Sequence, residues 1–354
     1  MKLIKSLLVT LMATLLMVGI GAGAAIAKEK KVLLKVPVAF SSTLPILGES
    51  IVFFKDTVEK LSDGDIKVKI YEPGKLMPAL EIHDSVSTGK VNAGYGVSGY
   101  YQGKIPAISM FTAVPFGPKP VEFAGWLYEG NGMKLYQELY DKHGVNVKAF
   151  PLCIWSPETG GWYNKEINSA ADLKGLKIRF FGYGGKVLSK LGAAVVTIPG
   201  GEIYPALEKG AIDASEFALP NIDTKLGFAK VAKYNYFPGW HQPATAGELL
   251  INKDTWNGMS DRQKQIVETA IKATSFFIMT RSEAAQGRVM LENEAKYGTE
   301  NRLFSPELLD VIEKTWLEVA AEEAANDPDF KMVWDDLQAY VAETSAYNSR
   351  AHIK

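Results

Sequence analysis

Several residue types that particular functions require are scarce in this chain of 354 residues, and their scarcity excludes those functions. Cys153 is the only cysteine, so no disulfide can form within the chain and no thiolate cluster can hold a metal ion. We interpret it as a buried, inert thiol, with a nucleophilic thiol as the alternative. The histidines, His83, His143, His241 and His352, show no spacing typical of a metal site.

Concentrated positive charge is also missing. Lys and Arg together number 39 against 40 Asp and Glu, a formal net charge of −1. Because a nucleic-acid surface needs a basic face, we expect no nucleic-acid partner. The sequence contains no G-x-S-x-G elbow, H-E-x-x-H motif or phosphate-binding glycine loop. We therefore expect no enzyme, and a secreted enzyme acting on organic acids remains a remote alternative.

Only the N-terminus carries a long apolar run. Lys2 and Lys5 precede apolar residues 7–20, and small residues follow, ending at Ala27. This layout predicts a signal peptide over residues 1–27 that is cleaved after Ala27. A retained membrane anchor is the alternative, since the run approaches membrane-spanning length.

The rest of the chain alternates between strand and helix patterns. Apolar or alternating runs at 32–40, 66–71 and 91–98 predict strands, with amphipathic helices between them. A second strand, helix and strand series begins near residue 176, so we expect a second α/β domain. Residues 244–256 form a strand pattern that we expect to return to the first domain. From Ser260 the chain reads as helical, with breaks near Ser305 and Pro328.

Arg179 lies at the end of a short predicted strand (LKIRFF). Its guanidinium presents a rigid fork of donors that matches two carboxylate oxygens, so it is a candidate carboxylate clamp. A salt-bridged structural Arg is the alternative. The strand after residue 210 should deliver Glu216 and Phe217 to the same sheet edge. Glu216 would repel a bound carboxylate, so either a cation bridges the two or Glu216 pairs with Arg179.

Aromatic residues accompany these charges. Tyr100 and Tyr101 follow the strand at 91–98, where ligands bind in open α/β sheets, and they either reach a ligand or pack in the core. Phe180, Phe217 and Trp240 are candidates for the apolar walls of a pocket, with ordinary core packing as the alternative.

The order of several motifs resembles the solute receptors of tripartite ATP-independent periplasmic (TRAP) transporters over essentially the whole chain after the signal peptide. These motifs are EPGKLMPALEIHDSVSTGKVNAGYG, ADLKGLKIRFFG, EIYPALEKGAIDASEF, GELLINKDTW and the helix after Ser260. PETGGWYNKEI and KLGFAKVAKYNYFPGW are similar to the branch whose members bind 2-oxo acids such as pyruvate, or lactate, with a metal cation.

This resemblance implies an α/β, two-lobed periplasmic binding protein (type II-like) with crossing strands, a long connecting helix and a helical C-terminus. Such a receptor closes over a small organic acid in the periplasm and delivers it to sodium-coupled membrane permease subunits. The implied lobes are residues 28–155 with about 243–280, and 156–242 with about 281–327. Residues 328–354 form a C-terminal helix, and the helical tail makes a homodimer possible.

The resemblance also implies roles for individual residues. Arg179 binds the carboxylate, and Na⁺ or Ca²⁺ bridges to it through Glu216, the backbone at Phe217, and Gln242. In this branch Phe217 is often Trp and Gln242 often Glu, so the neutral amide lowers the negative charge of the site. The remaining implied substrate contacts are Tyr100, Tyr101, Glu158 and Phe217. A different acid bound without metal, such as a dicarboxylate, a sugar acid or an aromatic acid, is the alternative.

Overall fold

The computed structural model describes residues 30–351, and the chain from Val32 onward forms one compact unit. The predicted signal peptide therefore lies outside the described residues. Within the described range, no helix combines the length and the apolar character that crossing a membrane requires.

The first half of the chain builds two small sheets that are linked by a bridge between Val38 and Tyr95. Strand β1 (Val32–Pro37) pairs in parallel with β2 (Ile66–Tyr71) through the helix α2 (Leu47–Leu61). The second sheet has the order β3-β10-β4, with the late strand β10 in the middle and antiparallel to both neighbours. Residues 244–256 thus contain a strand that pairs with strands from the first half of the chain. Its strands are β3 (Ala93–Gly96), β4 (Val147–Trp155) and β10 (Thr245–Asn252).

The middle of the chain builds a six-stranded mixed sheet with the order β11-β9-β5-β8-β6-β7. Its members are β5 (Gly161–Tyr163), β6 (Lys177–Arg179), β7 (Ala194–Val196), β8 (Ala214–Ser215), β9 (Tyr234–Phe237) and β11 (Glu300–Leu303). The helices α6 (Gly182–Lys190), α7 (Gly200–Glu208) and α8 (Pro220–Leu226) connect or follow these strands. β11 corrects the sequence analysis, which expected only a turn there, because the segment pairs in parallel with the open edge of β9.

Four further helices contact the β3-β10-β4 sheet. They are α3 (Ile82–Ser87), α4 (Pro120–Tyr128), α5 (Gly132–Lys142) and α9 (Lys253–Asn257). Short 3₁₀ helices complete the connections: η1 (Ala79–Glu81), η2 (Ser98–Tyr101), η3 (Pro106–Phe111), η4 (Ala170–Leu173) and η5 (Phe228–Lys230).

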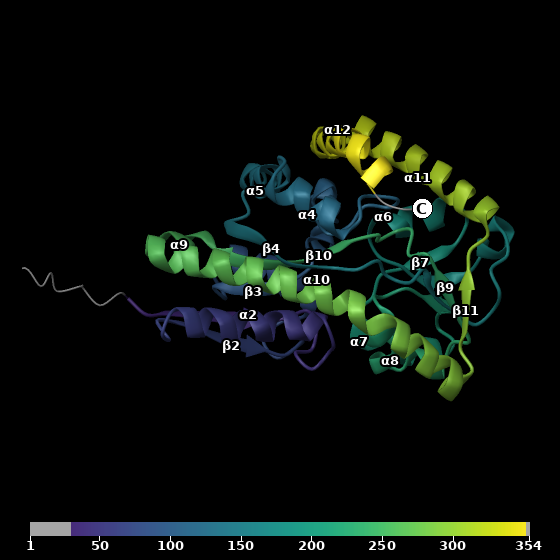
Figure 1. Ribbon diagram of the computed structural model, residues 1–354, viewed down its shortest axis with the longest axis horizontal. Helices are drawn as coiled ribbons and strands as arrows, with labels where there is room; N and C mark the ends of the chain where they lie inside the picture. Colours follow the sequence, from purple (N-terminus) through teal and green to yellow (C-terminus); the bar gives the residue numbers. More distant parts are fainter. Residues whose placement is uncertain (1–29, 352–354) are drawn as a thin grey trace, which may run out of the picture. The chain divides into compact units, whose positions relative to one another are not determined.

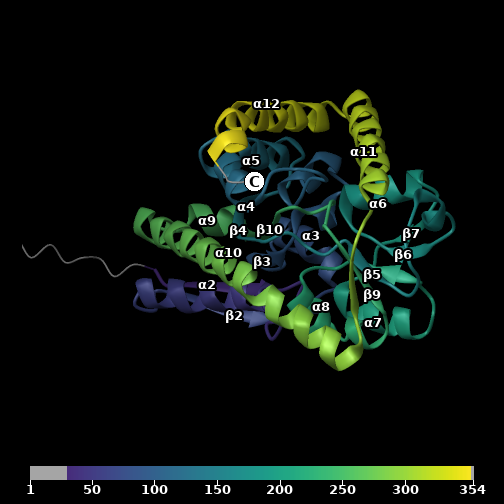
Figure 2. The same ribbon diagram turned by 45° about the vertical axis from the view of Figure 1, so that its right-hand side comes forward.

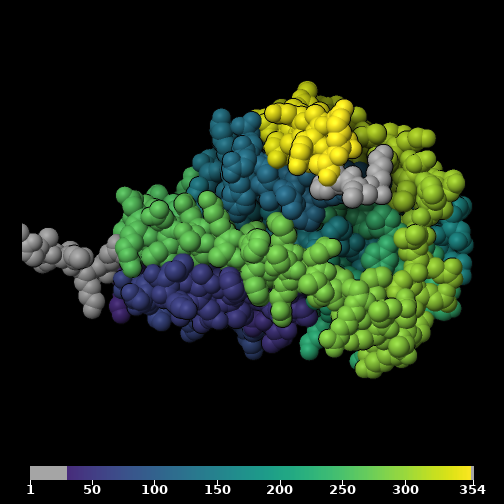
Figure 3. Space-filling model, in the orientation of Figure 1, coloured from purple at the N-terminus to yellow at the C-terminus, as the bar shows by residue number. Residues whose placement is uncertain are grey.

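The long helix α10 (Asp261–Tyr297) runs past both groups of strands (Figures 1 and 2). Its N-terminus is capped as predicted, since the Ser260 hydroxyl accepts a hydrogen bond from the Gln263 amide. The helix contacts β4 and α2 in the first half of the chain, and it contacts α8 and strand β11 of the six-stranded sheet. One side of α10 is exposed beside α2 (Figure 3).

Two further helices end the described chain. Ser305 caps α11 (Pro306–Asn326) by accepting a hydrogen bond from the Leu308 amide, and α12 (Pro328–Ala351) starts at the predicted proline. α11 packs on α6, whereas α12 packs on η3, α4 and α5. Phe330, Val333 and Leu337 form the buried stripe of α12, with the spacing of an amphipathic helix.

Candidate functional site

Arg179 ends strand β6, which lies between β8 and the edge strand β7, and its side chain is buried at 2% exposure. Its Nη1 atom donates to the backbone oxygen and to Oε1 of Glu216, both at 2.7 Å, and Nε donates to the Ile198 carbonyl at 3.2 Å. Its Nη2 atom has no hydrogen-bond partner among residues 30–351. The guanidinium is therefore fixed on one side and keeps donors available on the other.

Glu216 reaches Arg179 because β8 lies parallel to β6, with Ser215 opposite Arg179. Burial raises the pKa of Glu216, but the Arg179 charge and the nearby His241 lower it more, so the net shift is downward. The carboxylate is thus held ionised. Only Oε1 is paired with Arg179, and the buried Oε2 has no hydrogen-bond partner in the described chain.

Glu158 lies on the segment that joins β4 to β5 of the six-stranded sheet. Its Oε1 atom accepts hydrogen bonds from Trp155 Nε1 at 3.0 Å, Gln242 Nε2 at 2.9 Å and Thr245 Oγ1 at 3.2 Å. Its Oε2 atom is buried with no partner in the part of the chain described here. Burial first, and then the negative charge of Glu216, raise the pKa of Glu158 well above its ordinary value.

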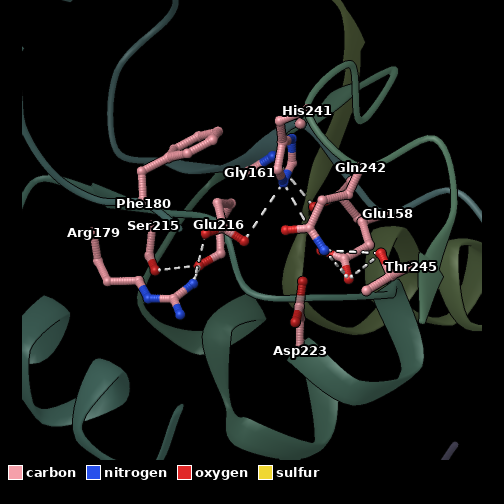
Figure 4. A network of polar contacts seen from close by, with 12 residues as sticks. Glu158, Gly161, Arg179, Phe180, Ser215, Glu216, Asp223, His241, Gln242 and Thr245 are labelled. Atoms are coloured by element: carbon pink, nitrogen blue, oxygen red, sulfur yellow. Dashed lines mark hydrogen bonds and ion pairs between the residues drawn. The ribbon is translucent and has the colours of Figure 1, made fainter. Parts of the chain in front are cut away.

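His241 completes this cluster. Its Nε2 atom lies 3.5 Å from Glu216 Oε2 and 3.8 Å from Glu158 Oε2, and the three residues offer atoms that all lie within 4.8 Å of one another (Figure 4). His241 shows no metal-binding spacing along the sequence, and the structure nevertheless brings it close to two carboxylates. The two carboxylates arrive from other segments, so spacing along the chain could not reveal the cluster.

Asp223 on α8 is a further acidic residue near this cluster, and the sequence analysis did not select it. Trp162 Nε1 donates to Asp223 Oδ2 at 2.8 Å, and the side chain points toward the Glu158 and Gln242 side chains in Figure 4. Burial, assisted by the charge of Glu216, raises the pKa of Asp223 to about 8. An isolated Asp in a short helical pattern carries no signal of this placement.

A small cavity of about 30 Å³ adjoins these groups. Its lining comes from both halves of the fold and includes five of the residues that the sequence analysis selected. They are Tyr100, Glu158, Arg179, Phe217 and Gln242, together with Phe40, Leu47, Val97, Thr112, Trp155, Phe181, Ala218 and Thr245. Glu216 is paired with Arg179 but is not among the lining residues.

The two adjacent tyrosines are separated by the structure. Tyr100 lines the cavity, and its hydroxyl makes no hydrogen bond with any residue between 30 and 351. Burial raises its pKa, so the phenol stays protonated and can donate. Tyr101 instead stacks on His83 with ring centroids 4.9 Å apart and donates to Asp84 at 2.9 Å. The structure does not bring Tyr101 to the cavity.

The aromatic residues take two different positions. Phe217 lines the cavity, and the Arg179 guanidinium lies 5.4 Å from the centre of its ring. Phe180 and Trp240 stack on each other at 5.7 Å and both contact the His241 ring, at 4.6 and 5.6 Å. They therefore hold His241 in place rather than line the cavity.

The donor set fits a bound cation. Two buried carboxylate oxygens and one imidazole nitrogen converge without hydrogen-bond partners within the described residues. Isolated buried negative charges are costly, and a cation between them removes that cost. The free Nη2 of Arg179 and the Tyr100 hydroxyl provide donors for an anion in the same cavity. The site is thus suited to binding a cation and a small anion together.

Comparisons with known proteins identify the family of this chain. Residues 39–326 match the family model for bacterial extracellular solute-binding protein, family 7. The chain is 37% identical over 291 residues to the monocarboxylate 2-oxoacid-binding periplasmic protein of Nostoc sp., covering 82% of this chain and 79% of the relative.

Two solved structures superpose on nearly the whole chain. One is a TRAP periplasmic solute-binding protein from Pseudoalteromonas atlantica with bound sodium and pyruvate, with a TM-score of 0.85, 32% identity, and coverage of 90% of this chain and 98% of that one. The other is a TRAP transporter solute-binding protein from Bordetella bronchiseptica, a mixed-occupancy dimer with copurified calcium and picolinate, with a TM-score of 0.85, 31% identity, and coverage of 90% and 94%. The predicted two-lobed α/β fold is confirmed.

Proposed function

The chain belongs to the bacterial extracellular solute-binding protein family 7, and from this premise we propose that it binds a monocarboxylate 2-oxo acid such as pyruvate, or lactate, together with a bridging Na⁺ or Ca²⁺. As a member of this family the chain is a TRAP solute receptor and no enzyme. The ligands in the structures from Pseudoalteromonas atlantica and Bordetella bronchiseptica are small acids with a second donor atom next to the carboxylate.

One observation carries this proposal. The free Nη2 of Arg179 and the unpaired carboxylate oxygens of Glu216 and Glu158 belong to one buried site beside a cavity of about 30 Å³. At 4 Å, two like charges repel by about 4 kcal/mol at an effective dielectric of about 20. A carboxylate would therefore bind poorly beside these acids alone. A cation between them turns the repulsion into attraction, so the acid and the cation should bind together.

Each residue has a role in this proposal. Arg179 Nη2 donates to the substrate carboxylate, and the Tyr100 hydroxyl donates to a substrate oxygen. Glu216 and Glu158 hold the cation, and the backbone carbonyl of Phe217 supplies a further oxygen, as hard cations prefer. Gln242 already donates its amide nitrogen to Glu158, so its role includes orienting that carboxylate.

The cellular arrangement is also proposed. A cleaved signal peptide over residues 1–27 exports the chain, and membrane permease subunits receive the acid. The proposed lobe boundaries are those given in the sequence analysis, and the distribution of strands between the sheets supports them. Because both lobes contribute lining residues, substrate binding favours a closed state that the permease recognises. The dimer from Bordetella bronchiseptica supports a homodimer.

Calorimetric titration tests the proposal. Tag-free protein lacking residues 1–27, stripped of ligand by partial unfolding, is titrated with pyruvate, picolinate and succinate in sodium, calcium and chelator-treated buffers. We expect pyruvate binding that depends on a cation and is lost in Arg179→Ala and Glu216→Ala. Arg302→Ala, which removes an exposed Arg paired with Glu300, is the matched control and should bind normally.

Other outcomes would reject parts of this proposal. Tight picolinate binding without pyruvate binding would favour a chelating aromatic acid. Succinate binding without any cation would indicate a dicarboxylate receptor. Pyruvate binding that is indifferent to Arg179 would remove the assigned clamp.

A further inference from the structure

Glu248 is a buried carboxylate that the proposed binding of an acid and a cation does not use. It lies on β10, the middle strand of the β3-β10-β4 sheet, and its side chain is 2% exposed. Its Oε2 atom pairs with His83 Nε2 at 2.6 Å, and its Oε1 atom accepts hydrogen bonds from the Tyr136 and Tyr140 hydroxyls. We call these four residues the Glu248 network.

The two tyrosines of the network are held as hydrogen-bond donors. Burial first, and then the charge of Glu248, raise the pKa of Tyr136 and the pKa of Tyr140 well above the ordinary value. Both phenols therefore stay protonated and direct their hydrogens at the carboxylate. Such bonds fix the positions of the three side chains relative to one another, because a buried carboxylate without donors would be strongly destabilising.

One route leads from this network to the end of the 3₁₀ helix η2. The His83 ring stacks on Tyr101 with centroids 4.9 Å apart and an interplanar angle of 15°. The Tyr140 ring also contacts Tyr101, at a centroid distance of 6.5 Å. Tyr101 is the last residue of η2 and directly follows Tyr100. Two members of the Glu248 network thus hold the end of η2.

A second route leads from the network to the start of η2. The Tyr136 ring stacks on Phe111 with centroids 4.5 Å apart. The next residue, Thr112, accepts a hydrogen bond on its hydroxyl oxygen from the backbone amide of Gly99 at 2.8 Å. Gly99 is the second residue of η2. Both ends of η2 are therefore fixed by contacts that converge on one buried carboxylate.

Tyr100 lies between these two fixed ends. Its ring contacts Phe40 and Phe181 at the cavity, with centroid distances of 6.1 and 5.6 Å. Its hydroxyl makes no hydrogen bond with any residue between 30 and 351. The backbone of η2 must therefore set the direction of this hydroxyl. Because successive side chains of a 3₁₀ helix point about 120° apart, a small rotation of η2 would turn the hydroxyl away from the cavity.

We infer that Glu248 is a positioning residue for the bound acid, because its network holds η2 in the conformation that turns the Tyr100 hydroxyl toward the cavity. This inference rests on the proposed function, which assigns that hydroxyl to a substrate oxygen. Glu248 is not among the residues that line the cavity, so its effect on the acid passes through Tyr100.

A double-mutant cycle tests the inference. Pyruvate is titrated by calorimetry, in buffer with sodium and calcium, into tag-free protein without residues 1–27. The four proteins are wild type, Glu248→Gln, Tyr100→Phe and the double variant. Glutamine keeps the size of the side chain and an acceptor oxygen, but it loses the charge that strengthens the hydrogen bonds of the network. We expect Glu248→Gln to weaken pyruvate binding about fivefold. The double variant should bind no more weakly than Tyr100→Phe alone.

Asp329→Asn is the matched control. Asp329 is also a buried carboxylate that pairs with a histidine, at 2.8 Å from His143, and it receives a further ion pair from Lys142. Its partners are on the partly exposed end of α5 and just after it. Asp329→Asn should lower the free energy of unfolding, measured with urea, and leave the pyruvate affinity unchanged.

Tyr136→Phe provides a second variant in case Glu248→Gln does not fold. It removes one donor of the network and keeps the ring that stacks on Phe111. We expect it to weaken pyruvate binding about threefold, and to have no further effect when combined with Tyr100→Phe.

The outcomes separate the inference from the proposed function. A loss of affinity in Glu248→Gln that is equal with and without the Tyr100 hydroxyl, or no loss at all, overturns the inference and leaves the proposed function intact. An equal loss in Asp329→Asn would show that affinity follows stability, and this also overturns the inference. Failure of wild type to bind pyruvate overturns both.

Discussion

Arg179 and Glu216 form an ion pair in which both side chains are at most 2% exposed and the Nη1 and Oε1 atoms are 2.7 Å apart. The pairing uses only one terminal nitrogen of the guanidinium and one oxygen of the carboxylate. Arg179 and Glu216 therefore neutralise each other's charge. Each of them still has one terminal atom, Nη2 or Oε2, without a hydrogen-bond partner in the described chain. The two alternatives for Glu216, pairing with Arg179 or holding a cation, are compatible in this geometry.

Replacing only one residue of the buried Arg179–Glu216 pair should destabilise the protein more than replacing both. Arg179→Met leaves the Glu216 charge unpaired and should lower the free energy of unfolding by about 3–5 kcal/mol. The double variant Arg179→Met with Glu216→Met removes both charges and should be at least as stable as wild type. Urea unfolding measures both. Equal destabilisation in the single and double variants would show that packing, and not charge pairing, dominates.

The raised pKa of Asp223 predicts that the free energy of unfolding depends on pH. Its pKa is raised from the ordinary 3.8 to about 8, chiefly by burial, so the folded state binds more protons than the unfolded state between these values. Its contribution is fully present below about pH 4 and is lost as the pH rises through about 8. Relative to Asp223→Asn, wild type should lose up to about 1.4 kcal/mol of stability per pH unit. Unfolding in chelator buffer from pH 5 to 8 checks this, and parallel profiles would contradict it.

Two helix-start glycines form a matched pair. A Cβ at Gly184 would press on Phe180 and His241, whereas one at Gly201 would meet nothing within 4 Å. Gly184→Ala should therefore destabilise the protein by about 1–3 kcal/mol and weaken cation binding. Gly201→Ala should be neutral or stabilising by up to about 1 kcal/mol, because Ala favours helix. Thermal unfolding measures the stability of the two variants, and calorimetry measures their cation binding. Equal effects of the two substitutions would contradict the packing of His241 against Gly184.

The adjacent tyrosines should respond differently. Tyr100→Phe removes a hydroxyl that we assign to the substrate, and it should weaken pyruvate binding roughly tenfold, the loss of about one hydrogen bond. Tyr101→Phe removes a hydroxyl that is bonded to Asp84 and should change pyruvate affinity by less than about threefold. Titration of both variants checks the assignment. A larger loss of pyruvate affinity in Tyr101→Phe than in Tyr100→Phe would contradict the assignment of Tyr100 to the substrate.

Tyr101 also shows why a sequence pattern could not settle the site. The two tyrosines end the 3₁₀ helix η2, in which successive side chains point about 120° apart. Neighbours in the sequence therefore face different surroundings, and only the backbone conformation decides which one faces the cavity. Phe180 and Phe181, which follow strand β6, are also separated, because successive side chains of an extended segment point to opposite sides: Phe180 contacts His241, whereas Phe181 lines the cavity.

Local patterns in the sequence determined the alternating strands and helices, the caps at Ser260 and Ser305, and the return of residues 244–256 to the first domain, where they join the β3-β10-β4 sheet. They also placed Arg179 and Glu216 at one edge, because parallel strands bring their carboxyl ends together. The convergence of Glu158, Glu216 and His241 was decided only by the tertiary structure. Their positions depend on two crossings between the sheets and on the packing of Phe180 against Gly184, contacts between distant segments that no local periodicity encodes.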